Sequence, residues 1–442
     1  MIPNNICCIG AGFVGGPTMA VIALNCPEIK VTVVDSNKKK INAWNGDLKK
    51  LPVYEPGLSQ IIEKVRNKNL FFSNDISQAI KNAQIIFMAV NTPTKKSGKG
   101  AGMAADLSNI VNCAKDIAKF STSNKIVIEK STLPVRTAEK IKEILLKENR
   151  NIKFEILSNP EFLAEGTAIN DLFKSDRVLI GGDNTNSGKK AIKVLVNIYS
   201  RWIPKEKILT TNVWSSELAK LASNAMLAQR ISSINSLSAL CEKTGADIFE
   251  LSKAIGMDKR IGPYFLNPSV GFGGSCFQKD ILNLVYLSKY YGLNEIAEYW
   301  HQVVKINDYQ KTSFAQKIIN ALGKNYNSKT VGILGWAFKK NTNDSRESAS
   351  IYVTKILLEQ GISIKVFDPL VEKTKIIYDL KDIKTDNLDR IMVCDSIKNT
   401  IDKVDLIAIM TESDEYKKIK SKALIFDGRG INPNSNYTIG KV

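Results

Sequence analysis

The sequence contains a single histidine, His301, among 442 residues. A histidine-rich metal site is therefore excluded, and a Ser-His-Asp triad would depend on this one side chain. His301 lies in a helical pattern, where we expect a packed or surface residue. Acid–base chemistry must fall to lysine, aspartate, glutamate or water, and no metal ion is expected.

Long apolar runs and paired cysteines are also lacking. No apolar stretch is long enough to span a bilayer, and no basic leader precedes the first strand pattern. The seven cysteines show no CxxC spacing, which indicates reduced thiols rather than a disulfide framework. Cys7 and Cys8 fall in the first predicted strand, where burial is expected. These features predict a cytoplasmic protein without a membrane partner.

Negative charge is in deficit, because 62 lysines and arginines face 44 aspartates and glutamates, a net charge of +18. The positive residues are mostly lysines spread along the chain, and the longest run is Lys38–Lys40. Dispersed lysine is typical of a solvated surface rather than of a stripe that binds nucleic acid. We expect no nucleic-acid partner, although small anionic ligands such as nucleotides should be favoured.

Short, almost continuously apolar runs alternate with helical patterns in the first part of the chain. The predicted strands are Ile6–Ile9, Val31–Val34, Ile85–Val90, Ile126–Glu129, Glu155–Ser158 and Val178–Ile180. Such runs are expected where helices cover both faces of a parallel sheet. From about Trp214 long helices follow, the first from Glu217 to about Thr244, capped by Ser215 or Ser216 and closed by Gly245.

Further helix extends to about Leu322, interrupted by a Pro- and Gly-rich loop at 261–275, and the strand alternation then restarts. The later predicted strands are Thr330–Leu334, Ile364–Phe367, Leu406–Met410 and Ala423–Phe426. The pattern predicts an α/β fold, with two Rossmann-like, doubly wound parallel-sheet domains joined by a long central helical connector. The expected domains are residues 1–212, 213–325 and 326–442.

A glycine motif follows the first predicted strand: Gly10-Ala11-Gly12-Phe13-Val14-Gly15. Its glycines allow a tight turn and let backbone amides approach a pyrophosphate at a helix N-terminus. Asp35 ends the next strand, where a carboxylate accepts from ribose hydroxyls. The context predicts dinucleotide binding, with NAD favoured over NADP, although Lys38–Lys40 lie nearby.

Polar segments follow three other strands at the edge where open α/β sheets bind ligands. They are Asn91–Thr94 after Val90, Lys130–Pro134, and Asn159–Gly166. Taken alone, each is more often a proline-containing turn. Glu161 and Glu165 are four residues apart and could share one helical face.

Cys276 follows the glycine-rich run Gly271–Ser275 at the start of a helical pattern. An isolated cysteine is mostly a small apolar packing residue, but a helix N-terminus favours thiolate. Lys220 and Asn224 lie four apart on one face of the long helix, where a surface lysine is the commoner alternative. A hydride-removing cofactor combined with a thiol that can hold an acyl group suggests a carbon that is oxidised more than once.

The assembled motifs resemble the eukaryotic-type UDP-glucose 6-dehydrogenases within the UDP-glucose/GDP-mannose dehydrogenase family. The matching segments cover nearly the whole chain to Arg429 and include ICCIGAGFVGGPT, VNTPT, EKSTLPVR, LSNPEFLAEGTAI, SVGFGGSCFQKDILNLVYL, FKKNTNDSRESASIYVTK and FDGR. The resemblance implies a four-electron oxidation of UDP-glucose at C6 to UDP-glucuronate, using two NAD⁺ and one water. A thiohemiacetal and then a thioester would form on Cys276.

The resemblance also implies roles for individual residues. Those implied to be catalytic are Cys276, Lys220, Asp280, Glu161, Asn224 and Thr132. Those implied to contact NAD are Gly10, Gly12, Phe13, Val14, Gly15, Asp35, Val90, Asn91, Thr92, Ser131, Glu165 and Arg346. Those implied to contact the UDP-sugar are Glu161, Phe162, Leu163, Lys220, Asn224, Arg260, Phe265, Asn267, Gly271, Phe272, Gly273, Phe277, Phe338, Lys339 and Arg429.

Within this scheme Lys220 stabilises the C6 oxyanion, Asn224 contacts the oxygen, Asp280 holds a water and Glu161 is the base for hydrolysis. Arg260 would reach the site of a neighbouring subunit. The family implies a homo-oligomer, with a dimer formed through the central helix and a hexamer built from three dimers.

The chain departs from the family pattern at a few positions: Phe13 replaces a frequent Tyr, Asn341 and Ser345 replace an acidic residue and Thr, and Gly430 follows Arg429. Three alternatives stay open. They are a sister enzyme acting on GDP-mannose or a UDP-N-acetylhexosamine, an inactive NAD-binding scaffold, and a simple two-electron dehydrogenase.

Overall fold

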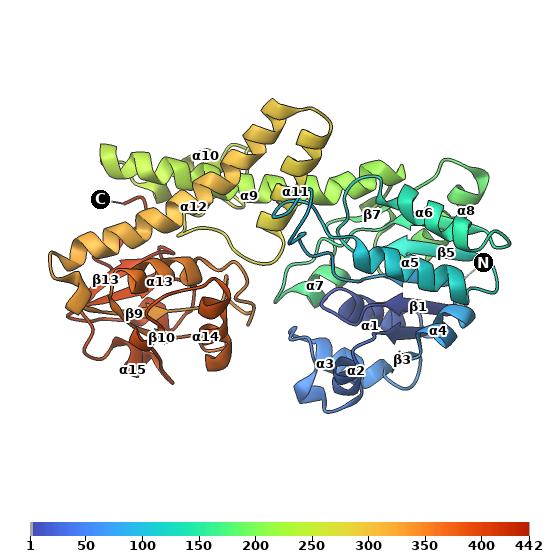
Figure 1. Cartoon of the computed structure of the whole chain (residues 1–442), viewed down its shortest axis with the longest axis horizontal. Coiled ribbons are helices and arrows are strands. Elements are labelled where there is room, and N and C mark those ends of the chain that lie inside the picture. The colour runs from blue at the N-terminus through green and yellow to red at the C-terminus, as the bar shows by residue number, and fades with distance from the viewer. Residues whose placement is uncertain (1–2, 442) are drawn as a thin grey trace. The chain divides into compact units, whose positions relative to one another are not determined.

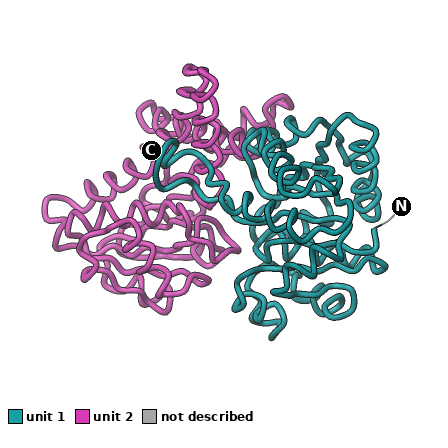
Figure 2. Tube along the Cα trace, turned by 45° about the vertical axis from the view of Figure 1, so that its right-hand side comes forward, with its two compact units in different colours: residues 1–223 teal, residues 224–442 magenta. Residues whose placement is uncertain are grey.

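A computed structural model describes residues 3–441 (Figure 1). The chain divides into two compact units, residues 1–223 and 224–442, which Figure 2 colours separately. The boundary falls inside the long helix α9 (Val213–Thr244), so this helix contributes residues to both units. The three-domain division expected from the sequence remains a prediction.

The first unit is built on an eight-stranded sheet with the strand order β3-β2-β1-β4-β5-β6-β7-β8. The strands are β1 (Asn5–Ile9), β2 (Lys30–Val34), β3 (Leu70–Ser73), β4 (Ile85–Met88), β5 (Lys125–Glu129), β6 (Phe154–Ser158), β7 (Val178–Gly182) and β8 (Ile208–Thr211). β1 to β6 pair in parallel, as expected. The expectation of parallel pairing is wrong at β7, which runs antiparallel to β6, with Leu157 opposite Gly182.

The sequence reading missed β3 and β8, which lie at the two edges of this sheet. In β8 no residue is fully buried, and in β3 buried and half-buried residues alternate. An edge strand is covered less completely than a central one, so its sequence need not be continuously apolar. The rule that found the central strands therefore does not find these two.

Helices cover both faces of the first sheet. They are α1 (Gly15–Asn25), α2 (Lys38–Asn45), α3 (Leu58–Val65), α4 (Ile76–Asn82), α5 (Ser108–Phe120), α6 (Thr137–Glu148), α7 (Ala168–Phe173) and α8 (Asn186–Tyr199), with short 3-10 turns at Leu48–Lys50 and Lys205–Lys207. Ile6 and Cys8 pack into one hydrophobic core with residues of α1, α3, α7 and α8, whereas Cys7 and Ile9 pack into another with residues of α4, α5 and α6. The burial predicted for both cysteines is confirmed.

The start of α9 differs from the prediction. The helix begins at Val213, and its first turn is capped by Asn212, whose Oδ1 accepts the Ser215 N–H at 2.8 Å. Ser216 is fully buried, and its hydroxyl donates to the Ser158 carbonyl at 3.2 Å instead of capping the helix. At the other end Gly245, with φ of 79°, follows the last helical residue as expected.

The second unit begins within α9 and continues through a helical region into a second sheet. The helices before the sheet are α10 (Ile248–Gly256), α11 (Phe277–Tyr290) and α12 (Asn294–Leu322). The six strands are ordered β11-β10-β9-β12-β13-β14, and every pair is parallel. Their bounds are β9 (Thr330–Leu334), β10 (Ser363–Phe367), β11 (Ile391–Val393), β12 (Leu406–Ile409), β13 (Leu424–Asp427) and β14 (Tyr437–Thr438).

Three helices accompany this sheet: α13 (Ala349–Glu359), α14 (Lys373–Asp382) and α15 (Ile397–Ile401). Short 3-10 turns lie at Tyr326–Ser328, Leu388–Arg390 and Tyr416–Lys418. The edge strands β11 and β14 were not predicted, and they span only three and two residues. The other four strands overlap the predicted ranges, which confirms two parallel-sheet units of Rossmann type.

The loop after the first strand is held differently in the two sheets. At the end of β2, Asp35 accepts the Ala11 N–H at 3.0 Å and stays partly exposed. At the matching position in the second sheet, Asp368 accepts the N–H groups of Trp336 and Ala337 at 2.7 and 3.0 Å. Its other oxygen accepts from two further backbone amides, and Trp336 is fully buried. The second loop is thus closed by its own carboxylate and indole.

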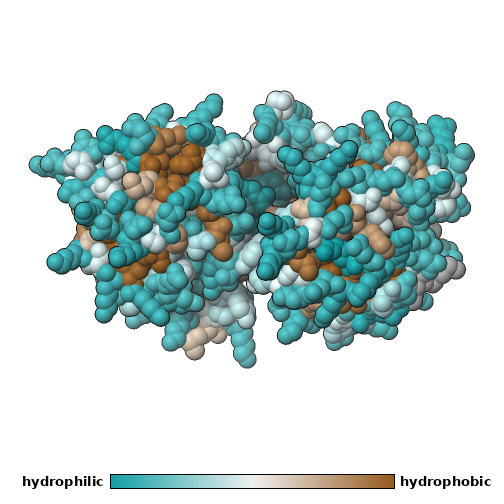
Figure 3. Space-filling model, turned by 90° about the horizontal axis from the view of Figure 1, so that it is seen from below, coloured by the Kyte–Doolittle hydropathy of each residue, from teal (hydrophilic) through white to brown (hydrophobic). Residues whose placement is uncertain are grey.

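On the face shown in Figure 3, hydrophilic side chains cover most of the surface, and hydrophobic ones form separate patches. None of the helices within residues 3–441 combines the length and the apolar character needed to cross a membrane. The same residues contain no group of three or more His, Cys, Asp or Glu side chains placed to hold a metal ion.

Candidate active site

The glycine loop after β1 has the geometry of a phosphate-binding turn. Gly10 has φ of 112°, and a Cβ there would lie 2.2 Å from the Ala89 carbonyl oxygen. A Cβ on Gly15, the first residue of α1, would lie 2.0 Å from the Gly10 oxygen. Gly12 instead faces open space, with nothing within 4 Å of its Cβ position. The helix N-terminus and its amides are therefore open to an anionic group.

Asp35 is placed to accept hydrogen bonds beside this loop. It receives the N–H of Ala11 and of Asn37, and Lys40 Nζ lies 2.8 Å from its Oδ2. Burial opposes ionisation, but the bonds from Lys40, Asn37 and Ala11 outweigh it and lower the pKa of Asp35. The open space beside Gly12 and an ionised carboxylate at the end of β2 fit the pyrophosphate and ribose of NAD.

The loops after β4 and β5 are joined by hydrogen bonds. Ser131 Oγ donates to the Val90 carbonyl at 2.6 Å, and Thr92 Oγ1 donates to the Thr132 carbonyl at 3.0 Å. These bonds bring four predicted site residues to the carboxyl edge of the sheet. Asn91, also predicted here, is exposed and accepts from Asn109 Nδ2 through its carbonyl.

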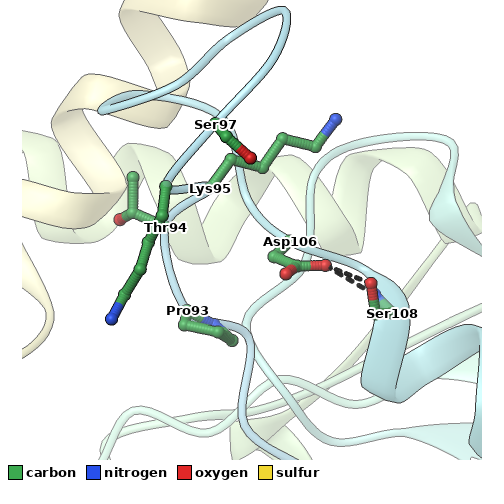
Figure 4. A pocket seen from close by; sticks show the side chains of 7 residues that line it. Pro93, Thr94, Lys95, Ser97, Asp106 and Ser108 are labelled. Carbon is green, nitrogen blue, oxygen red and sulfur yellow. Dashed lines mark hydrogen bonds between the residues drawn. The ribbon is translucent and has the colours of Figure 1, made fainter.

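The segment that follows Asn91 lines a surface cavity of about 360 Å³ (Figure 4). Its lining residues are Pro93, Thr94, Lys95, Lys96, Ser97, Asp106 and Ser108. Figure 4 shows Asp106 turned toward Ser108, whose hydroxyl and N–H both donate to Asp106 Oδ1. The two lysines and the hydroxyls of Thr94 and Ser97 come from this one loop, whereas Ser108 is the first residue of α5.

Glu161 and Lys220 form a buried ion pair in the first unit. Lys220 Nζ lies 3.1 Å from Glu161 Oε1, and the side chains are only 5% and 9% exposed. Glu161 Oε2 accepts the Leu163 N–H at 2.6 Å, and the Phe162 ring lies under the Lys220 ammonium. Four predicted residues therefore meet here. A pair so deeply buried leaves a costly uncompensated charge if either partner is removed.

The expectation that Glu161 and Glu165 share a helical face is wrong. Residues 159–164 are irregular, and the next helix, α7, begins only at Ala168. Pro160 cannot donate to a helix and disfavours helical backbone at Asn159. The irregular backbone instead lets the Glu161 carboxylate turn back onto the Leu163 amide.

Sequence reasoning missed one further lysine beside this pair. Lys130 directly follows β5 and is 4% exposed, with Nζ donating to Asn159 Oδ1 at 3.1 Å. The segment Lys130–Pro134 was predicted to lie at the ligand-binding edge of the sheet, but only Ser131 and Thr132 were assigned a role. A lysine directly after a strand whose central residues are all apolar is the signal that could have identified it.

In the second unit Cys276 occupies the N-cap position of α11 and is half-buried, whereas the other six cysteines are buried thiols. Asp280 lies one turn along α11 and is 1% exposed. Its Oδ2 accepts Asn224 Nδ2 at 2.6 Å, and Lys279 Nζ lies 3.7 Å from its Oδ1. The structure thus joins Asn224 to Asp280, two residues that the sequence places far apart.

The loop leading to Cys276 is held by Asn307 of α12. Asn307 Oδ1 accepts the Phe272 N–H at 2.8 Å, and its Nδ2 donates to the Phe272 carbonyl at 3.0 Å. Gly271 has φ of 127°, and a Cβ there would lie 2.8 Å from Asn307 Oδ1. Farther along, the Gly274 N–H donates to the Arg346 carbonyl at 2.8 Å. The close approach of Asn307 and the positive φ explain why position 271 is a glycine.

The other predicted contact residues of this unit fall into two groups. Phe265, Phe272 and Phe277 stack edge to face or tilted, with centroids 5.9 to 6.5 Å apart. Arg429 donates to the backbone carbonyls of Met410 and Phe338, which places it beside a predicted sugar contact.

Two of the predicted arginines form ion pairs with nearby aspartates. Arg260 is largely exposed and pairs with Asp258 of its own turn. Arg346, predicted for NAD, pairs with Asp344 within the second unit. Asn267 is exposed, and Lys339 is half-buried. Their roles toward ligands remain predictions.

Three family models match successive parts of the chain. They describe the UDP-glucose/GDP-mannose dehydrogenase family: its NAD binding domain matches residues 4–203, its central domain 214–309 and its UDP binding domain 332–434. The chain belongs to the UDP-glucose/GDP-mannose dehydrogenase family. It is therefore an NAD-dependent oxidoreductase, and the glycine loop and Asp35 lie in the matched NAD binding domain.

Individual relatives agree with this assignment. The chain is 53% identical to UDP-glucose 6-dehydrogenase 3 of Arabidopsis thaliana over 96% of this chain and 93% of the relative. It is 54% identical to UDP-glucose 6-dehydrogenase of Mus musculus, over 97% and 89%. A UDP-glucose dehydrogenase structure from Pyrobaculum islandicum superposes with a TM-score of 0.88 at 28% identity, covering 100% of this chain and 98% of that one.

Proposed function

We propose that this protein oxidises UDP-glucose twice at C6, giving UDP-glucuronate. The observation that carries the proposal is the identity of more than half, along nearly the whole chain, to enzymes named UDP-glucose 6-dehydrogenase. Cys276, at the N-terminus of α11 beside the Asn224–Asp280 pair, supports the thiol chemistry. In the balanced reaction, UDP-glucose, two NAD⁺ and one water give UDP-glucuronate, two NADH and three protons.

NAD⁺ supplies the hydride acceptor for both oxidations. In the first, the C6 hydroxyl gives up its proton and C6 gives up a hydride, while the Lys220 ammonium stabilises the negative charge that develops on oxygen. Asn224 donates to the same oxygen. The Cys276 thiolate then adds to the aldehyde carbon, and this covalent bond retains the half-oxidised sugar.

The aldehyde oxygen takes up a proton as the thiohemiacetal forms. Loss of this proton together with the second hydride gives the thioester. Asp280 holds a water, Glu161 takes a proton from it, and the resulting hydroxide attacks the thioester carbon. The carbon–sulfur bond breaks, and the sulfur leaves as thiolate. Thr132 and Glu165 would lie beside the nicotinamide and its waters, as the family resemblance implies.

The Lys220–Glu161 ion pair suits the two roles proposed here, in which Lys220 stabilises the oxyanion and Glu161 is the base. Each charge compensates the other before substrate binds, at less than one-tenth exposure. A substrate oxygen would then share Lys220, and the carboxylate would become available as a base. The same two residues therefore serve successive steps in turn.

The test is the amount of NADH formed for each UDP-glucose consumed, measured by absorbance with limiting sugar. Two NADH per sugar are expected, and one would identify a two-electron dehydrogenase. Cys276→Ser should lower turnover by about a thousandfold or more, while Cys394→Ser, which alters a buried thiol of the same unit, should not. Full activity of Cys276→Ser would overturn the thioester route.

A panel of nucleotide sugars tests the substrate itself. UDP-glucose should be oxidised in preference to GDP-mannose and to UDP-N-acetylhexosamines at equal concentration. Preference for another sugar would reassign the substrate while leaving the chemistry intact. If no sugar is oxidised, the inactive NAD-binding scaffold is the alternative that remains.

The proposal extends to assembly as a cytoplasmic homo-oligomer that dimerises through α9. This helix carries large exposed apolar side chains: Trp214, Leu218, Met226, Leu237 and Leu240. Light scattering with size separation should give a dimer or a multiple of it. A monomer at micromolar concentration would contradict this part of the proposal.

A further inference from the structure

Glu55 is a buried carboxylate that binds a distant segment of the first unit. It lies in the loop between the 3-10 turn Leu48–Lys50 and α3, and it is 6% exposed. Its Oε1 accepts the Gly166 N–H at 2.9 Å, and its Oε2 accepts the Ala168 N–H at 3.1 Å. An ionised carboxylate forms hydrogen bonds roughly twice as strong as those between neutral groups. Glu55 therefore ties its own loop firmly to the start of α7.

Gly166 belongs to a tight turn, Ala164–Thr167, in which Glu165 is the second residue. The Thr167 N–H donates to the Ala164 carbonyl at 3.0 Å, and Gly166 has φ of 82°. A positive φ at the third residue is typical of a type II turn and favours glycine there. Glu165, which the resemblance places beside the nicotinamide, is thus presented at the corner of this turn.

A second carboxylate holds the other side of the same turn. Asp171 of α7 accepts the Ala164 N–H at 2.9 Å and the Thr167 hydroxyl at 3.0 Å, both through Oδ2. The two neighbours of Glu165 in the chain therefore donate their amides to different carboxylates. Ala164 donates to Asp171, and Gly166 donates to Glu55.

Apolar packing fixes the two segments that carry these carboxylates. Val53 and Leu58, which flank Glu55, belong to the same hydrophobic core as Ile169 and Leu172 of α7. All four side chains are less than one-tenth exposed. The loop of Glu55 cannot shift along α7 without disturbing this core.

We propose that Glu55 and Asp171 are positioning residues, which together fix the turn that carries Glu165. The inference rests on the proposed function, in which Glu165 lies beside the nicotinamide and its waters. Misplacement of a reacting group by about 1 Å can slow a reaction by about a hundredfold, even when the substitution is remote. Amides held on both sides of Glu165 restrict such movement, although neither carboxylate touches a ligand in this role.

The experiment compares the full-length wild type with Glu55→Gln at saturating UDP-glucose and NAD⁺. Glutamine keeps the length of the side chain but has one accepting oxygen, so one of the two amides loses its partner. The value of kcat should fall by about tenfold or more. Thermal unfolding shows whether the variant is folded, and an unchanged kcat in the folded variant would overturn the proposal.

Binding of ADP-ribose separates positioning from a general loosening of the unit. This probe has the pyrophosphate and riboses of NAD⁺ but no nicotinamide, so the turn should not affect it. Calorimetry should give Glu55→Gln an affinity for ADP-ribose within about twofold of the wild type, and a loss of about tenfold would overturn the proposal. Failure of the proposed function is distinguishable, because it would abolish UDP-glucose oxidation in the wild type itself.

Thr185→Val is the matched control. Thr185 Oγ1 accepts the Gly188 N–H at 3.0 Å and caps α8. It follows β7, which runs antiparallel to β6, so this cap lies at the opposite edge of the sheet. The variant loses a capping bond but should keep the wild-type kcat. A fall in kcat as large as that of Glu55→Gln would reduce the effect to loss of a cap and overturn the proposal.

If Glu55→Gln does not fold, Asp171→Ala decides. Asp171 is half-buried, and alanine favours a helix, so this replacement is milder than that of the buried Glu55. It removes both bonds to the turn and should give the same result, a kcat lower by about tenfold with unchanged affinity for ADP-ribose. Wild-type kcat in folded Asp171→Ala would overturn the proposal.

Discussion

A buried pair of carboxylates in the first unit should make its stability fall as the pH rises. Glu129, the last residue of β5, is 1% exposed, and no described residue donates a hydrogen bond to its carboxylate oxygens. Glu217, on the first turns of α9, is 3% exposed and accepts the N–H groups of Arg136 and Ala138 at 2.7 and 2.8 Å. Burial and the neighbouring Glu217 raise the pKa of Glu129 well above its usual value.

Burial also raises the pKa of Glu217, although its backbone hydrogen bonds oppose the rise. A proton on Glu129 would allow it to donate to Glu217 and would remove the repulsion between two buried charges. The folded protein then binds one proton more than the unfolded chain at every pH between the unfolded and the raised folded pKa. In that window the free energy of unfolding falls by about 1.4 kcal/mol per pH unit.

Glu129→Gln imitates the protonated state, because its amide can donate to Glu217 at every pH. The variant should therefore lack this slope. About 1 kcal/mol corresponds to about 2 to 4 °C for a unit of this size. The Tm of the wild type should thus fall relative to Glu129→Gln by about 3 to 6 °C per pH unit.

Thermal unfolding followed by tryptophan fluorescence between about pH 5.5 and 8.5 measures this difference. Glu143→Gln, which alters an exposed glutamate of α6, is the control and should keep the wild-type slope. Parallel Tm curves for wild type and Glu129→Gln would refute the shared proton. A Glu129→Gln curve that falls more steeply than the wild type would refute the sign of the effect.

Two further substitutions test the ligand-binding loops. Gly10→Ala places a methyl group 2.2 Å from the Ala89 carbonyl oxygen. It should weaken NAD binding by about tenfold or more, as measured by calorimetry, and unchanged affinity would contradict the turn described for this loop. Asn307→Leu removes both hydrogen bonds to the Phe272 backbone. It should slow the alkylation of Cys276 by iodoacetamide while the second unit stays folded. An unchanged rate would show that Asn307 does not position the thiol.

Much of the fold was predictable because central parallel strands and their loops obey simple rules. β1, β4 and β5 are covered on both faces, so the residues between their ends are continuously apolar. The glycine spacing up to Gly15 and the position of Asp35 follow from the geometry of a strand that turns into a helix. The antiparallel placement of β7 was not predictable, because strand direction leaves no trace in a run of apolar residues.

The clusters at the site were only partly predictable. The motif around Cys276 marks a reactive loop, and the helical spacing of Lys220 and Asn224 places them on one face of α9. Partners that come from distant segments leave no such mark. The pairing of Asn224 with Asp280 and the support that Asn307 gives to Phe272 arise only when separate segments pack together.

The closed loop of the second sheet shows how duplicated architecture can separate two duties. Asp35 leaves part of its bonding capacity facing outward, where a cofactor can use it, whereas Asp368 is consumed by four amides of its own chain. An aspartate at the same strand end can thus accept hydrogen bonds from a ligand in one sheet, and it stabilises its own loop in the other. Substitution of Asp35 should thus lower the affinity for the cofactor, whereas substitution of Asp368 should lower the yield of folded protein.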